Sequence, residues 1–486
     1  MRVLPIYLIV LTISACSTEI PEYIPQPISI ESSIDGLPQR FEWARNTALS
    51  YVSSGEDSVG LWYEAALPGR DAFCMRDVSH QALGAHFLGL DAHTQNMLFQ
   101  FARNISEGKD WCSFWEITKN GVPAGVDYRD DDAFWYNLPS NFDVLDASYR
   151  MYQWTNDVTY IEHPVFLNFY EKTVSDYVDT WDLGPQKVLI RSRYMNRESF
   201  DLNDPYQYAR GIPSYHEGDI EKTRLGIDLL AFQVAAYRSY AAILEKTGQP
   251  SKSMEMLSRA VRASNMITEA FWKEDVGHFS ELLLENGKTT MGGGMQIYAL
   301  YNDAVPDPVK ASSAAASILD NDPGNIEMRS YYPEVMYRYG LYGEALDMIM
   351  LITSDSTERR TYPEVSFAVI GAIATGLMGI SPIEKGIATI SRISTENDWV
   401  ELGHFPHLKS VLSLKHSGAT ASSLSVRSGE KILWKATFAG SHSELVVNGR
   451  RLRASQTFDH LGNPVSFIEI EVYPLENITV STLLSD

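Results

Sequence analysis

The 486-residue sequence contains little cysteine and few basic residues, and its apolar runs are short. It has 3 cysteines, and 40 Lys and Arg against 62 Asp and Glu give a formal net charge of −22. Such an acidic chain lacks the basic face that phosphate contacts require, which argues against nucleic acid as a partner. The longest apolar stretch after the N-terminus, residues 369–380, is interrupted by glycine and too short to span a bilayer, so it predicts a buried helix.

The N-terminal segment has the pattern of a bacterial lipoprotein signal. A short apolar run follows Arg2 and ends in Ile13-Ser14-Ala15-Cys16. About ten apolar residues cannot cross a bilayer core that needs roughly twenty, and small residues suited to cleavage follow them. We therefore expect a signal over residues 1–15, lipidation of Cys16 and an anchor in the cell envelope. The outer membrane is favoured, with the protein facing the periplasm or the surface. A secretory signal cut elsewhere is the alternative.

Three further regions differ in their pattern. Residues 16–36 contain several prolines and no helical period, which predicts an extended tether. Residues 37–384 show about twelve stretches of helical spacing, such as 79–104, separated by loops rich in Gly, Pro, Asp and aromatics. We expect an (α/α)6 toroid of helical hairpins; an α-solenoid is the rival, but no fixed repeat recurs. Residues 385–486 alternate apolar and polar residues between turns, which predicts a β-sandwich.

Two cysteines remain once Cys16 carries lipid. In an oxidising compartment Cys74 and Cys112 would either form a disulfide or stay as two buried thiols, and both alternatives stand. Neither has a sequence context typical of a nucleophile.

Arg76, Asp77 and His80 stand where a helix begins, in the stretch "MRDVSHQ". In a toroid of helical hairpins, polar residues at the starts of the inner helices face a common funnel. We therefore interpret these three as substrate-binding residues. The alternative is a helix cap, with Asp77 accepting from the first-turn amides.

A second cluster, "DYRDDDAFWYNLPSNFD" at residues 127–143, combines Asp131 and Asp132 with Trp135. Sugar sites use carboxylates to hold hydroxyl groups and aromatic faces to contact C–H surfaces, so these three are candidate substrate-binding residues. A calcium loop and a solvated acidic loop are alternatives. The spacing does not match an EF-hand, and we expect no metal and no cofactor.

A third cluster precedes a long helix and consists of Tyr215, His216, Glu217 and Asp219. Cleavage of a sugar linkage needs a carboxyl group that donates a proton, usually one whose pKa is raised by a partly apolar setting. Glu217 and Asp219 are the candidate acids, with Tyr215 and His216 beside them as substrate-binding residues. A helix cap is again the alternative.

Two late glutamates, Glu334 and Glu364, each follow a proline at the start of a predicted helix. Pro-Glu in a first turn is favoured for stability alone, since proline fits there and the carboxylate faces the positive end of the helix. Their aromatic neighbours make both candidate catalytic residues.

With these residues the chain resembles the six-hairpin glycosidase superfamily, over roughly residues 37–380. "MRDVSHQ" is similar to the motif with which those enzymes hold the terminal sugar, matched here by Arg76 and Asp77. "YHEGD", followed by its long helix, resembles the acid-bearing loop and matches Glu217 and Asp219.

This resemblance implies an exo-acting, inverting glycoside hydrolase that takes oligosaccharides or polysaccharide fragments. Glu217 or Asp219 would protonate the leaving oxygen, and Glu364 or Glu334 would activate water, with carboxyl groups roughly 6.5–9.5 Å apart.

Two other functions stay open. Members of the same fold act on uronates, which they hold through arginines, and Arg191, Arg193 and Arg197 stand close together in this sequence. A lyase, dehydratase or unsaturated-uronide hydrolase is therefore an alternative, with Arg193 as a substrate-binding residue. The third possibility is a glycan-binding lipoprotein without activity.

Overall fold

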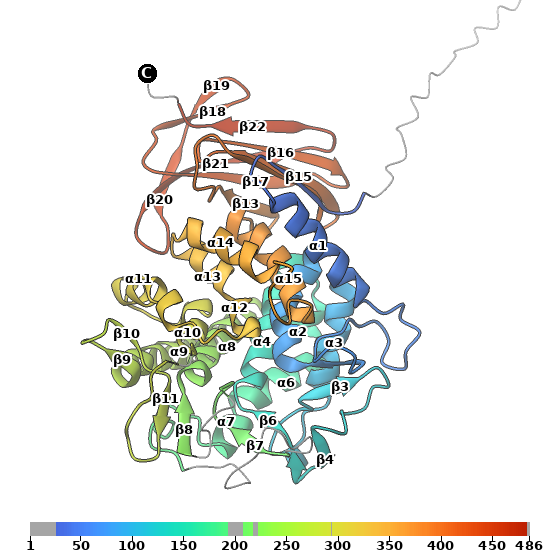
Figure 1. Cartoon of the computed structure of the whole chain (residues 1–486), viewed down its shortest axis with the longest axis vertical. Coiled ribbons are helices and arrows are strands. Elements are labelled where there is room, and N and C mark those ends of the chain that lie inside the picture. The colour runs from blue at the N-terminus through green and yellow to red at the C-terminus, as the bar shows by residue number, and fades with distance from the viewer. Residues whose placement is uncertain (1–25, 193–207, 217–221, 293, 484–486) are drawn as a thin grey trace, which may run out of the picture.

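The computed structural model describes residues 26–192, 208–216, 222–292 and 294–483, and it consists of a helical region followed by a β-sheet region (Figure 1). Most of the chain from Leu37 to Leu377 is helical, and most of it from Ser381 to Ser481 is in strands. The predicted order of a mainly helical part and then an all-β part is confirmed. The boundary between residues 384 and 385 stays a prediction.

Six helical segments contact one another in a series that returns to its start. Each member contacts the next, and the last contacts the first. In chain order they are α2 (Met75–Phe87), α4 (Ser140–Thr155), α8 (Ile227–Lys246), α10 (Gln296–Tyr301), α13 (Tyr332–Arg338), and α15 (Pro363–Gly371) with its π-helical continuation η4 (Ala372–Leu377). We call these the inner helices.

A second set of helices alternates with the inner helices along the chain. These outer helices are α1 (Leu37–Ser50), α3 (Asp91–Arg103), α6 (Pro164–Val174), α9 (Pro250–Phe271), α11 (Pro308–Ala316) and α14 (Tyr342–Ile352). The inner helix α8 is buried on nearly all sides, whereas the outer helix α9 buries one face, with Met256, Ala260 and Ile267 on it. This difference is expected between an internal helix and an amphipathic helix that covers it.

The prediction of one helix over residues 79–104 is wrong. Helix α2 ends at Phe87 and α3 begins at Asp91, because Gly89 between them adopts a left-handed conformation with φ of 76°.

A second glycine, Gly84, explains how α2 packs against α15. A Cβ at Gly84 would lie 2.0 Å from the carbonyl oxygen of Phe367, so only glycine allows α2 and α15 to approach this closely.

Two sheets make up the β region in the part of the chain that the structure describes. Their strand orders are β1-β14-β15-β16-β22-β18-β19 and β12-β13-β17-β21-β20. The strands of the first are β1 (Ser29–Ser32), β14 (Trp399–His407), β15 (Ser410–Ser417), β16 (Ala421–Ser428), β22 (Asn477–Ser481), β18 (Glu444–Val447) and β19 (Arg450–Arg453). Those of the second are β12 (Ser381–Ile383), β13 (Gly386–Ile390), β17 (Ile432–Ala439), β21 (Pro464–Val472) and β20 (Ser455–Phe458).

Part of the predicted tether belongs to the fold. Strand β1 pairs antiparallel with β14, and Ile28 and Ile30 are buried. The interpretation of the whole segment 16–36 as an extended tether is therefore wrong for residues 29–32, because alternating apolar residues anchor them to a sheet.

The β region packs against the C-terminal ends of two inner helices. The rings of Phe87 and Phe405 lie 5.8 Å apart, and those of Trp154 and His407 also lie 5.8 Å apart. In Figure 1 the labelled strands of these two sheets accordingly lie above the helices. The opposite ends of the inner helices are where the candidate site forms.

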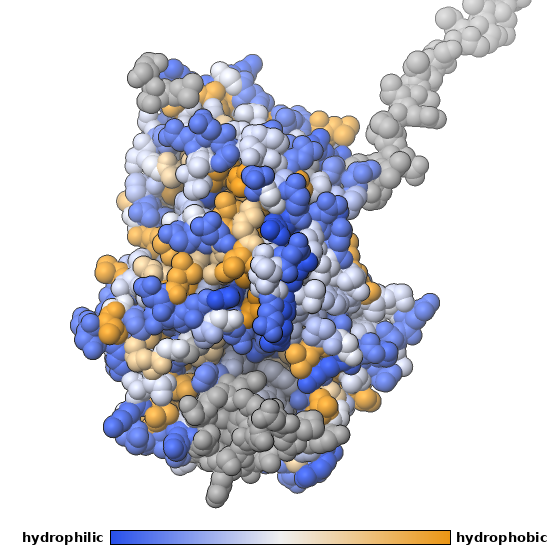
Figure 2. Space-filling view, in the orientation of Figure 1, coloured by the Kyte–Doolittle hydropathy of each residue, from blue (hydrophilic) through white to orange (hydrophobic). Residues whose placement is uncertain are grey.

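The structure also bears on the cysteines, the longest apolar run and the surface. Cys74 and Cys112 are both buried and unpaired, so the structure has two buried thiols rather than a disulfide. The apolar run at 369–380 lies in the buried α15 and η4, as predicted. None of the described helices is both long and apolar enough to cross a membrane. On the face seen in Figure 2, apolar residues are scattered over a largely hydrophilic surface.

Candidate active site

Polar side chains gather where the N-terminal ends of the inner helices meet. Arg76 and Asp77 lie in the first turn of α2. The Arg76 Nη2 atom lies 2.6 Å from Oε2 of Glu327, which belongs to the short helix α12 (Ile326–Arg329). Tyr362, the residue before α15, donates its hydroxyl to Asp77 Oδ2 at 2.7 Å. Three segments that are far apart in the sequence thus meet around Asp77.

Glu327 is held between two guanidinium groups. Besides Arg76, it accepts from Arg359 Nη2 at 2.7 Å. Burial alone would raise the pKa of Glu327, but the two arginines outweigh it and hold the pKa below its ordinary value. Glu327 is therefore the ionised counterion that allows Arg76 to be buried.

Glu364 is fully buried at the start of α15 and pairs with His80 of α2. The His80 Nδ1 and Glu364 Oε1 atoms lie 2.7 Å apart. The His80 ring stacks on Tyr331, with centroids 3.5 Å apart and an angle of 8° between the planes. The second carboxyl oxygen, Oε2, is buried and has no hydrogen-bond partner among the described residues. One carboxyl oxygen is thus fixed by His80, and the Tyr331 side chain beside the group helps to lower the pKa of Glu364.

Burial shifts the titration of this site strongly. It raises the pKa of Glu364 to about 8 and that of Asp77 to about 7, although Arg76 lowers both. It lowers the pKa of His80 to about 3, so this imidazole is neutral at neutral pH. Carboxyl groups that titrate close to neutral pH in a polar cluster are characteristic of acid–base catalysis.

Tyr215 extends the cluster toward α4 and α8. Its hydroxyl lies 3.1 Å from Oδ2 of Asp143, in the first turn of α4, and its ring lies 5.8 Å from the Arg76 guanidinium carbon. Its backbone N–H donates to Asp228, in the first turn of α8, at 2.5 Å. Burial raises the pKa of Asp143 well above its ordinary value. His216 follows at the edge of the described segment, and its N–H donates to Ser214 Oγ at 2.9 Å.

Other candidates do not lie in this cluster. Glu334, in the first turn of α13, accepts from Arg338 Nη2 at 2.9 Å and lines a separate cavity toward the C-terminal ends of α2 and α4, although its charge also acts to raise the pKa of His80 against the larger effect of burial. Asp131 and Asp132 are exposed in the turn of a small hairpin. Trp135 is buried and donates its indole N–H to Asn137 Oδ1 at 2.7 Å, so most of its ring lies within the protein.

Four predicted residues lie outside the described segments: Cys16, Arg193, Glu217 and Asp219. Arg197 lies outside them as well. Arg191, from the same arginine-rich stretch, is buried and donates to the backbone carbonyls of Trp181 and Arg224, both at 3.0 Å. These contacts give Arg191 a structural role.

No reasoning from sequence singled out Glu327, Tyr331, Tyr362 or Arg359. Their signal was weak but present. A buried Arg76 requires a counterion, and Glu327 stands two residues after Asn325, whose side chain caps α12. Tyr362 directly precedes Pro363-Glu364, and Tyr331 stands two residues before Pro333-Glu334, so the aromatic context of these motifs was the pointer.

Comparison with solved structures relates this fold to sugar-processing enzymes. The chain is similar to the α-L-rhamnosidase of Dictyoglumus thermophilum, with a TM-score of 0.56, 11% identity, and 94% of this chain aligned to 51% of that one. It is similar to the family GH78 rhamnosidase of Bacillus sp. GL1, with a TM-score of 0.57, 13% identity, and 82% of this chain aligned to 41%. A protein named a sialidase matches with a TM-score of 0.55 at 11% identity, covering 90% of this chain and 41% of that one.

These likenesses define the class of fold. The chain is structurally similar to six-hairpin glycosidases at low identity, and it spans about half or less of the length of these three enzymes. The sequence matches no protein-family model and no curated protein. Identity this low indicates a shared fold, while activity must be argued from the site.

Proposed function

We propose that the protein is a glycoside hydrolase built on an (α/α)6 toroid with an appended β-sandwich. The closed series of contacts among the inner helices and the likeness to rhamnosidases support this architecture. The observation that carries the function is the buried pair of Glu364 and His80 beside Arg76 and Asp77, at the meeting point of inner-helix N-termini. Here carboxyl groups titrate near neutral pH within reach of polar groups that can hold a sugar.

Glu364 is the better of the two candidate bases. It lies in the cluster with an unpaired carboxyl oxygen, whereas Glu334 is engaged by Arg338 elsewhere. In its ionised form, Glu364 would take a proton from water while the Nδ1–H of neutral His80 donates to its other oxygen. The proton for the leaving oxygen would come from Glu217 or Asp219. This division of roles corresponds to hydrolysis with inversion.

The sugar would be held mainly by Asp77, with Arg76 and Tyr215 forming the wall. Asp77 accepts from Tyr362 and has a raised pKa, so it can both donate to and accept from sugar hydroxyls. His216 and the exposed Asp131 and Asp132 are proposed to contact more distant parts of the substrate. Because the inner helices would close the site at one end, a sugar chain could enter from the other end only. This favours removal of a terminal sugar.

Proton abstraction from an acidic sugar is the second candidate. It is favoured by the position of His80, a neutral imidazole that stacks on Tyr331 and contacts Glu364, so that the two side chains could move a proton together. Such a lyase or dehydratase would hold the uronate through Arg193.

We also propose lipidation at Cys16 and an outer-membrane anchor. Incorporation of radiolabelled palmitate into the full chain, and its loss in C16A, would test this proposal.

The enzyme classes can be separated in one experiment. The protein is incubated with a panel of neutral and uronate-bearing oligosaccharides, with Glu364→Gln in parallel, and product masses and ultraviolet absorbance are recorded together. Products that sum to substrate plus water, without a new chromophore and absent in the variant, support the hydrolase. An unsaturated uronate chromophore without added water contradicts it and supports elimination. Retained glycan binding without turnover on the panel would indicate the non-catalytic alternative.

A further inference from the structure

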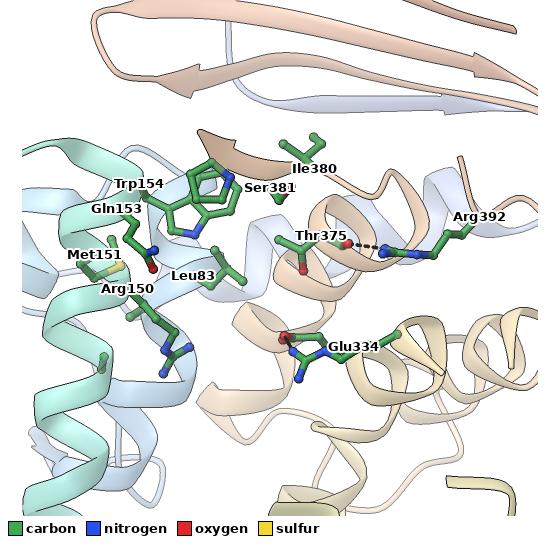
Figure 3. Close-up of a pocket in the computed structure, with 14 residues that line it drawn as sticks. Leu83, Arg150, Met151, Gln153, Trp154, Glu334, Thr375, Ile380, Ser381 and Arg392 are labelled. Atoms are coloured by element: carbon green, nitrogen blue, oxygen red, sulfur yellow. Dashed lines mark hydrogen bonds and ion pairs between the residues drawn. The ribbon is translucent and has the colours of Figure 1, made fainter. Parts of the chain in front are cut away.

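A cavity of about 250 Å³ lies at the end of the inner helices opposite the candidate active site. Figure 3 shows Arg150, Met151, Gln153 and Trp154 of α4 on one side of it and Glu334 of α13 across from them. Its wall is completed by residues of α2, η4 and β12 and by the residue before β12, namely Ala82, Leu83, Thr375, Ser381, Pro382 and Ile380, with Ala147, Arg338 and Arg392. Ser381 is exposed, so the cavity opens to solvent at β12.

The charges around this cavity do not balance. Arg150 pairs with Asp146 at 2.8 Å, and Arg338 pairs with Glu334 at 2.9 Å. Arg392 has no ion-pair partner among the described residues. Its Nη1 donates to the backbone carbonyls of Thr375 and Gly376, both at 2.7 Å, which fixes the guanidinium at the cavity wall. Glu334 attracts Arg392 as well, but this carboxylate is already paired with Arg338.

Holding Arg392 there without a counterion costs free energy. Burial lowers the pKa of Arg392 below its ordinary value, which reflects the loss of hydration around its charge. The guanidinium fork has five N–H donors, and within the described part of the chain only its Nη1 is engaged by backbone carbonyls. The remaining donors suit an oxyanion, and guanidinium pairs with a carboxylate in a planar, two-bond geometry.

The rest of the wall suits an uncharged molecular body. Leu83, Met151, Trp154 and Ile380 contribute apolar surface, and Gln153 and Thr375 contribute polar groups. An apolar protein cavity of about 150 Å³ accommodates benzene. The larger volume here can therefore accept a ring that carries a carboxylate.

We propose that this cavity binds a small organic carboxylate, with the carboxylate on Arg392 and the body of the molecule against Trp154 and Leu83. The site is separate from the candidate active site, and the proposal does not depend on the reaction catalysed there. A guanidinium–carboxylate contact in a partly buried setting contributes enough that its loss weakens binding about tenfold or more.

Isothermal titration calorimetry with benzoate, glucuronate and inorganic phosphate tests the proposal on the purified protein. We expect saturable binding of at least one of the two carboxylates, weakened at least tenfold in R392Q and preserved in E364Q, which alters only the other end of the helices. R427Q removes the same charge from β16, away from the cavity, and should bind like the wild type.

Three outcomes would overturn the proposal: absence of binding by both carboxylates, equal binding in R392Q, or binding of phosphate alone. If circular dichroism shows that R392Q does not fold, two variants replace it. R392K keeps the charge but not the fork and should bind more weakly. S381W narrows the mouth without changing charge and should slow or abolish binding; unchanged binding in both contradicts the site.

Discussion

The two ends of the inner helices use ionisable residues in different ways. At the N-terminal ends, Asp77 and Glu364 are buried carboxyl groups with pKa values raised to about 7 and about 8. Toward the other end lies a cavity whose lining includes Arg392 and Glu334, and Glu334 is tied to Arg338 in a fixed ion pair. Groups that titrate near neutral pH are suited to moving protons, whereas groups locked in ion pairs are suited to holding structure or a ligand.

The largest effect that separates the two ends should come from substituting their glutamates. Glu364→Gln removes the proposed base and should lower kcat about 1000-fold on the substrate found by the panel, within the range of general acid–base catalysis. Glu334→Gln should lower it less than tenfold. Steady-state kinetics on both variants checks this, and the reverse order of effects would move the base to Glu334.

Stability should also depend on pH through Glu364. Its pKa is raised on folding from 4.5 to about 8, so its contribution to stability is complete below about pH 4.5 and is lost as the pH rises through 8. In urea unfolding, the wild type should lose on the order of 3 kcal/mol more than Glu364→Gln between pH 5 and pH 9. Parallel pH profiles for the two proteins would show that this carboxyl group is not the source.

Asp77→Asn should lower kcat/KM about 30- to 100-fold, because the amide cannot offer the same pair of oxygen acceptors to sugar hydroxyls. Tyr362→Phe, which removes only the hydroxyl that donates to Asp77, should have a smaller effect of about fivefold. Initial rates measured against substrate concentration for both variants test the role of Asp77 in holding the sugar. Equal losses would mean that Asp77 acts chiefly through Tyr362.

The smallest expected effect is a shift of the pH profile. Glu364 as a base requires the carboxylate, so kcat/KM should rise as the pH increases toward 8. His80→Leu removes the donor to Oε1 and should move this rise upward by about one pH unit. A profile recorded from pH 5 to 10 detects the shift, whereas an unchanged midpoint would exclude His80 from tuning Glu364.

Much of this arrangement could be predicted from local patterns. Four of the predicted residues stand at helix starts: Arg76, Asp77, His80 and Glu364. Such starts are expected to converge. The contact of Arg76 with Asp77 and that of His80 with Glu364 agree with this expectation. Sequence alone did not separate Glu364 from Glu334, because both follow proline in the first turn of a helix. Glu334 pairs with Arg338 one turn further along α13, an i,i+4 spacing that the sequence contains but that does not by itself show which glutamate joins the cluster.

Other features depended on long-range contacts that local patterns do not encode. The pairing of residues 29–32 with β14 joins segments separated by more than 360 residues, so the tether prediction missed it. The counterion Glu327 lies 251 residues from Arg76. The division of residues 79–104 into two helices has, by contrast, a local cause: one left-handed glycine, Gly89, within an otherwise continuous helical period.

We expect sugar chemistry to take place at the N-terminal ends of the inner helices. The most direct test is a crystal structure of Glu364→Gln with the substrate identified by the panel. We predict a terminal sugar within hydrogen-bond distance of Asp77, with residue 364 facing its anomeric carbon across one water molecule. A sugar bound only in the cavity beside Arg392, with none at Asp77, would contradict the account.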